Sequence, residues 1–146
     1  MFRITEPEKE QEVMMKDLKK ILVILTAVLL LYGVGYAKDY EVKKKAGDYD
    51  VEVKIDKNPP AVGKNNMEIE IKDADGKYVT DATVKVEYTM PAMPGMPAMD
   101  YKADAKLDGY EYKATMDLSM SGSWNVVVKI TLGDKTSKVK FSIDAQ

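Results

Sequence analysis

Residues 124–143 read W-N-V-V-V-K-I-T-L-G-D-K-T-S-K-V-K-F-S-I. Apolar side chains recur at alternate positions on both sides of Gly133-Asp134. Alternation of this kind predicts half-buried strands, and a Gly-Asp pair between two such runs predicts a hairpin turn. The stretch therefore predicts two antiparallel strands with one face in a core, and Trp124 in that core or at its margin.

The alternation extends back to residue 40, and no stretch after residue 38 has helical periodicity. Further alternating runs cover residues 49–55, 67–72, 84–89, 101–107 and 110–117, with turn signals at 46–48, 75–76 and 108–109. One apolar and one charged face per run is typical of antiparallel sheets. We therefore expect an all-β, immunoglobulin-like antiparallel sandwich of seven to eight strands, without the disulfide of antibody domains because the chain has no Cys.

The direction of successive strands predicts which loops share an end of the sandwich. If every connection reverses direction, residues 57–66, residues 90–99 and residues 118–123 lie at one end. Such an end is where sandwiches carry their binding loops. We expect Met120 and Trp124 to lie near the 90–99 loop.

That loop reads M-P-A-M-P-G-M-P-A-M, with methionines at three-residue spacing: Met90, Met93, Met96 and Met99. Polyproline II has about three residues per turn, so this form would line all four thioethers along one edge. Two plainer interpretations stay open. The stretch is a Pro/Gly-rich loop between strands, and Met is a flexible apolar residue that fills irregular surface.

Thioethers are soft ligands that select Cu(I), or Ag(I), over hard cations. The chain has no His and no Cys, so sulfur ligation falls to methionine. The candidate metal ligands are Met90, Met93, Met96, Met99 and Met120. We interpret Trp124 as a core residue, with cation–π contact to a bound ion as the alternative. We expect Met67 and Met116 to pack in the core.

Composition argues against several other functions. Acidic and basic residues are interleaved at a net charge of −2, which gives no electrostatic basis for nucleic-acid binding. Without His or Cys, a nucleophile has no customary base, so we expect no enzymatic activity. Asp73-Ala74-Asp75-Gly76 resembles the start of a calcium loop but lacks its remaining acidic positions, so we interpret it as a hairpin turn.

Residues 1–37 have the pattern of an export segment. A basic stretch at 16–20 precedes an apolar run from Ile21 to Leu31, with small residues at Gly35 and Ala37. This predicts a signal peptide cleaved after Ala37, with Met14 or Met15 as the alternative start. The alternative is an uncleaved membrane anchor, for which the 17 residues from Ile21 to Ala37 are short. We expect residues 1–37 to be this helical segment and residues 38–146 to be an extracytoplasmic domain, periplasmic or at the cell surface.

Three segments in this order resemble the YtkA-like domain family, which includes the periplasmic region of FixH proteins. They are N-P-P-A-V-G-K-N-N-M (58–67), I-K-D-A-D-G-K-Y-V-T-D-A-T-V (71–84) and, after the Met/Pro loop, G-Y-E-Y-K-A-T-M-D-L-S-M-S-G-S-W-N-V-V-V (109–128). FixH-like proteins are linked to copper-transporting ATPases and to maturation of cytochrome oxidase. The resemblance implies an extracytoplasmic sandwich, in some members involved in copper handling, whose partners are copper transporters or oxidase assembly proteins.

Together these observations predict an exported Cu(I)-binding or Cu(I)-delivery accessory module. The alternative is a module without metal whose Met/Pro loop contacts a partner protein, because flexible Met-rich surfaces adapt to partners.

Overall fold

The computed structural model describes residues 14–17 and residues 38–146. Residues 14–17 are helical, and the predicted signal or anchor helix otherwise lies outside the described residues. None of the helices in the described part of the chain is long and apolar enough to cross a membrane. The chain divides into two units, residues 1–36 and residues 37–146, and the strands belong to the second.

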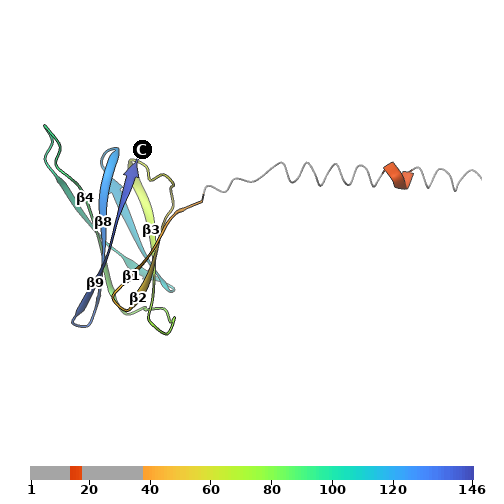
Figure 1. The fold of residues 1–146 in the computed structure, drawn as a ribbon, viewed down its shortest axis with the longest axis horizontal. Helices are drawn as coiled ribbons and strands as arrows, with labels where there is room; N and C mark the ends of the chain where they lie inside the picture. Colours follow the sequence, from red (N-terminus) through yellow and green to blue (C-terminus); the bar gives the residue numbers. More distant parts are fainter. Residues whose placement is uncertain (1–13, 18–37) are drawn as a thin grey trace, which may run out of the picture. The chain divides into compact units, whose positions relative to one another are not determined.

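Residues 38–146 form an all-β antiparallel sandwich, as the alternation predicts (Figure 1). Its strands are β1 (Tyr40–Ala46), β2 (Tyr49–Ile55), β3 (Gly63–Lys72), β4 (Thr83–Met90), β5 (Met99–Asp104), β6 (Lys106–Asp108), β7 (Glu111–Leu118), β8 (Gly122–Leu132) and β9 (Lys135–Ala145). One sheet has the order β1-β2-β3-β7-β6 and the other β5-β4-β8-β9. Without β1, this is the order of strands A, B, E, D and C′, C, F, G in an immunoglobulin-type sandwich.

The described residues contain nine strands rather than seven or eight, because the predicted strand 101–107 is two strands. β5 pairs with β4, whereas β6 pairs with β7 in the opposite sheet. The chain crosses between sheets at Ala105, whose N–H donates to the carbonyl of Val84 at 3.0 Å. The apolar alternation continues through the crossover, so it could not reveal the change of sheet.

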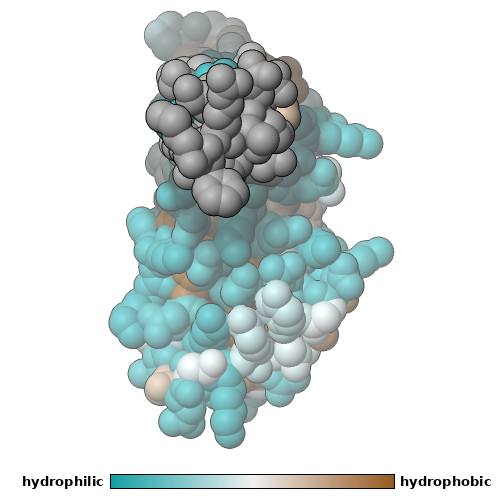
Figure 2. All heavy atoms as spheres, turned by 90° about the vertical axis from the view of Figure 1, so that its right-hand side faces the viewer, coloured by the Kyte–Doolittle hydropathy of each residue, from teal (hydrophilic) through white to brown (hydrophobic). Residues whose placement is uncertain are grey.

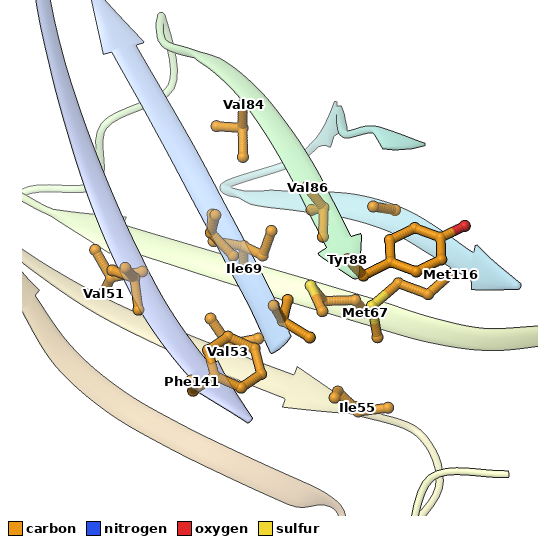
Figure 3. Close-up of a cluster of buried hydrophobic side chains, with 14 of the residues drawn as sticks. Val51, Val53, Ile55, Met67, Ile69, Val84, Val86, Tyr88, Met116 and Phe141 are labelled. Carbon is orange, nitrogen blue, oxygen red and sulfur yellow. The ribbon is translucent and has the colours of Figure 1, made fainter. Parts of the chain in front are cut away.

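The core lies between the two sheets and is built from the inward residues of the alternating runs. Figure 3 shows this packing and includes Met67, Met116, Val86 and Tyr88 among the buried side chains of the cluster. Met67, Met116 and Trp124 are fully buried, which confirms the prediction that they are core residues. All core residues lie between Ala46 and Ala145, so residues 38–146 fold around a core of their own.

The outward positions carry charge, and the face shown in Figure 2 is predominantly hydrophilic. Three residues from predicted inward sets are nevertheless exposed: Tyr101 by 38%, Leu107 by 45% and Tyr110 by 48%. Tyr101 and Leu107 lie on the edge strands β5 and β6, and Tyr110 lies in the turn before β7. Alternation predicts the face of a strand, but it does not show whether the other sheet covers that position.

Candidate functional site

The methionine loop is a hairpin that continues β4 and β5 beyond the sheets, seen at the upper left of Figure 1. At its tip, the N–H of Met93 donates to the carbonyl of Met96 at 3.0 Å. The N–H of Met96 donates to the carbonyl of Met93 at 2.8 Å. Pro94 and Gly95 form the turn between them, and Gly95 has φ = 81°. Proline followed by a residue of positive φ is the signature of a type II turn.

The hairpin replaces the polyproline II arrangement. Met90 lies opposite Met99, and Met93 lies opposite Met96, so the methionines form two cross-strand pairs rather than one row. Polyproline II has no internal hydrogen bonds, whereas the turn at Pro94-Gly95 lets the two arms bond to each other. The three-residue spacing is therefore not the geometric repeat of the site.

The five candidate ligands differ in exposure. Met93 at the tip is 45% exposed, whereas Met90 is only 3% exposed. The methyl of Met90 lies 3.2 Å from the position that a Cβ on Gly122 would occupy, so this side chain fills the space above a glycine of β8. Met96, Met99 and Met120 are half-buried, and Met99 and Met120 pack against the core. The loop therefore both covers the core and presents sulfur to solvent.

Ser119 connects Met99 to the loop that carries Met120. Its hydroxyl donates to the sulfur of Met99 at 3.3 Å and accepts from the Tyr101 hydroxyl at 3.4 Å. The indole N–H of Trp124 donates to the carbonyl of Met120 at 3.1 Å. These bonds hold the hairpin base and the 119–121 loop together, as the strand directions predict.

Three aromatic rings lie beneath this base. The Tyr101 ring centroid is 5.5 Å from that of Tyr88 and 5.9 Å from that of Trp124. The Tyr88 hydroxyl accepts from the N–H of Asp117 at 3.2 Å and so joins the two sheets. Because Trp124 is fully buried, it supports the base of the hairpin from the core.

The loop 57–62 and the chain terminus lie at the same end. The Gln146 N–H donates to the carbonyl of Pro60 at 2.9 Å, and the Val62 N–H donates to that of Gln146 at 3.0 Å. The Asn58 amide donates to the carbonyl of Lys38 at 2.9 Å, so the sandwich also begins at this end. The loop cluster predicted from strand direction is confirmed, although residues 63–66 of the predicted 57–66 loop belong to β3.

Other candidate ligands do not form a site. Among residues 14–17 and 38–146, no group of three or more His, Cys, Asp or Glu residues could hold a metal ion. The Asp73 carboxylate accepts from the N–H groups of Asp75 at 2.9 Å and Lys77 at 3.0 Å, which confirms that this segment is a turn. Within the described part of the chain, thioethers are therefore the ligands that remain for a soft ion.

The side chains whose pKa values are perturbed lie on the strands, away from the tip of the methionine hairpin. Hydrogen bonds from Lys54 to Glu70 and Glu52 raise the pKa of that lysine. Burial, with the nearby carboxylates of Glu68 and Glu70, raises the pKa of Glu111. Lys54 and Glu111 lie on the outer face of the sheet of order β1-β2-β3-β7-β6. Their ionisation therefore affects stability rather than the candidate site.

Sequence reasoning missed Ser119, Tyr101 and Gly122 as partners of the methionines. Alternation places Tyr101 on the inward face and so contained part of the signal. The contacts of Ser119 and Gly122 join segments about 20 or more residues apart, and no local pattern encodes them.

The YtkA-like family model matches residues 43–129. No curated protein matches the sequence. Among solved structures, the PmoD soluble domain from Methylocystis sp. ATCC 49242 aligns with a TM-score of 0.47 at 10% identity, over 71% of this chain and 96% of that one. FetP from uropathogenic E. coli strain F11 aligns with a TM-score of 0.46 at 10% identity, over 75% and 95%. The family match spans β2 to β7 completely and most of β1 and β8, and on that match the chain belongs to the YtkA-like family.

Proposed function

We propose that this chain is an extracytoplasmic, non-enzymatic module with an immunoglobulin-like sandwich that binds Cu(I) through methionine thioethers and passes it on. The observation that carries the proposal is the gathering of methionines from two separate loops at one end of the sandwich. Met99 and Met120 lie at the base of the hairpin, held together through Ser119, and Met93 and Met96 face each other at its tip. Neutral thioethers need no deprotonation and suit Cu(I).

The donors have different roles in this proposal. Met93 is the most open to an incoming ion and Met96, opposite it, is half-buried, whereas Met99 and Met120 pack against the core. Met90 joins the ligand set only if its side chain leaves the contact above Gly122. Partly exposed thioethers favour an exchangeable ion, which suits delivery.

The family resemblance supports partners among copper transporters or cytochrome oxidase assembly proteins. The predicted export segment supports a periplasmic or cell-surface location. If that segment is retained as an anchor, the sandwich is tethered to the membrane through Lys38, which lies at the methionine end.

Titration of Cu(I) into residues 38–146 against a chromophoric chelator tests the proposal. Wild type should compete for the ion, and a variant with Leu at all five methionines should not. Leu conserves volume, so folding should be retained. Two paired variants show which methionines bind the ion: Met93→Leu/Met96→Leu changes the tip, and Met99→Leu/Met120→Leu changes the base. Met67→Leu, in the core, is the matched control. Equal, weak competition by wild type and the five-fold variant would contradict the proposal.

A second function is favoured by the exposure of Met93 on a projecting, proline-rich tip. Flexible methionine side chains of this kind can adapt their packing to a partner protein. Crosslinking to a partner that survives Leu replacement, combined with no Cu(I) competition by wild type, would support this function over metal binding.

A further inference from the structure

The outer side of β5 is an open sheet edge. β5 ends the sheet of order β5-β4-β8-β9, and within residues 38–146 no strand pairs with its far side. At the opposite edge, the Tyr40 hydroxyl donates to the carbonyl of Ser142 at 3.1 Å, and Lys44 Nζ donates to that of Lys140 at 2.7 Å. Side chains therefore occupy backbone acceptors of β9, whereas β5 receives no such side chain from the described residues. An open edge is a template for another strand.

The register of β4 and β5 shows which backbone groups face outward. The N–H of Ala105 bonds to the carbonyl of Val84, next to the register pair Lys85 and Asp104. Antiparallel residue pairs alternate between bonded and non-bonded. The residues of β5 bonded to β4 are therefore Met99, Tyr101 and Ala103. The N–H and C=O groups of Asp100, Lys102 and Asp104 point away from β4, toward an incoming strand.

These outward residues form an acid–base–acid pattern that is complementary to itself. A two-fold pairing centred on Lys102 would place the two copies of that lysine opposite each other. A pairing centred on Asp100 would do the same with two aspartates, and both arrangements are destabilising. Pairing Asp100 with Lys102, or Lys102 with Asp104, opposes unlike charges. Asp104 already faces Lys85 at 3.9 Å.

Asp100 lies opposite the uncharged Thr89, and it has no ion pair within the described part of the chain. Lys102 Nζ lies 3.5 Å from Glu87 of its own copy, and Lys129 contacts the same carboxylate more closely, at 2.7 Å. The register that pairs Asp100 with Lys102 therefore gives Asp100 a cation that is shared with Glu87.

We propose that β5 pairs antiparallel with β5 of a second copy of this chain, with Tyr101 on the two-fold axis and Asp100 of each copy opposite Lys102 of the other. Tyr101 is 38% exposed although its ring packs on Tyr88 and Trp124, and the pairing covers it with its own symmetry mate. The same register places Met99 opposite Ala103 of the second copy. Ala103 lines a cavity of about 590 Å³ together with Asp104 and Ala114, so the second copy would also cover part of this hollow.

A strand of six residues gives a small interface, so the dimer should be weak, dissociating at about 10–100 μM. Sedimentation equilibrium of residues 38–146 over this range should show a reversible dimer. Asp100→Lys and Lys102→Asp should each weaken it about tenfold or more, because each creates two like-charge contacts. All three β5 charges are exposed, so thermal melts and Trp124 fluorescence should show an intact fold.

Charge exchange sharpens the test. The double variant Asp100→Lys/Lys102→Asp should recover the dimer, and mixing the two single variants should give a heterodimer in which both contacts are attractive. Asp104→Lys is the matched control and should dimerise as wild type does. A monomeric wild type, a double variant that stays monomeric, or equal weakening by Asp104→Lys and Asp100→Lys would each overturn the proposal. None of these outcomes depends on copper binding.

Discussion

Asn65 is a fully buried polar side chain on β3 that holds the loop beside the methionine end. Its carbonyl oxygen accepts from the N–H of Ala61 at 2.9 Å, and its amide donates to the carbonyls of Ala61 at 2.7 Å and Gly63 at 2.9 Å. Three backbone groups therefore depend on one side chain, and buried polar groups without partners are costly.

Asn65→Ala should lower the free energy of unfolding by about 1–3 kcal/mol, because it leaves these partly buried backbone groups without their partner. Urea denaturation measures the change. Asn66→Ala is the control: Asn66 is exposed, and its side-chain bonds to Asp56 and Thr115 can be replaced by water, so it should cost less than Asn65→Ala, at most about 1 kcal/mol. Similar values for the two variants would show that Asn65 does not hold the loop.

Glu111 is a carboxylate placed among other carboxylates. It lies opposite Glu70 on β3, which in turn lies opposite Glu52 on β2. Burial raises the pKa of Glu111, and the charges of Glu68 and Glu70 raise it further. Because the pKa is higher in the folded protein than in the unfolded chain, ionisation of Glu111 opposes folding.

Glu111→Gln should therefore be more stable than wild type at neutral pH, by less than about 1 kcal/mol for a partly exposed group. The difference should appear as pH rises through the folded pKa and vanish below the ordinary carboxyl pKa, where wild type is protonated in both states. Thermal melts as a function of pH measure it. Glu41→Gln is the control, because a hydrogen bond from Lys43 lowers the pKa of Glu41. This variant should be less stable than wild type at neutral pH. A pH-independent difference would contradict this account.

At the scale of single elements, the hairpin of β4 and β5 depends on the backbone of its tip. Gly95 has φ = 81°, which is costly for a residue with a side chain. The two backbone bonds between Met93 and Met96 close the turn. The tip lies beyond the last pair of β4 and β5, Met90 and Met99, so we expect a change there to leave the core packing intact.

Gly95→Ala should expose the amides of Met93 and Met96 to faster hydrogen exchange, corresponding to a local cost of about 1 kcal/mol. The midpoint of global unfolding should change little. NMR measures the hydrogen exchange of the two amides, and a thermal melt measures the midpoint of global unfolding. Gly95→Asn is the control, because Asn tolerates the left-handed region better. Unchanged exchange in the Ala variant would mean that the turn does not govern the tip.

At the scale of the whole molecule, residues 38–146 have one core between two sheets and a single tryptophan inside it. Trp124 is completely buried and contacts rings from β4 and β5. Its fluorescence therefore reports the integrity of the packed sandwich rather than of one loop.

Residues 38–146 should unfold in one cooperative step, with urea m-values of about 1–3 kcal/mol/M and coincident transitions by Trp124 fluorescence and far-UV circular dichroism. Reducing agents should have no effect, because the chain has no Cys. Separate transitions by the two probes would show that the sheets do not share one cooperative core.

Local patterns in the chain are enough to predict the all-β class, the inward and outward faces of most strands and the loops that meet at the methionine end. These follow from alternation and turn residues, which are local properties of the chain. Three features are visible only in the fold: Met93 and Met96 pair across a turn, Met90 is buried above Gly122, and the 101–107 run changes sheet at Ala105. Each depends on contacts between segments distant in the sequence: alternation specifies which face a side chain takes, and packing decides what covers it.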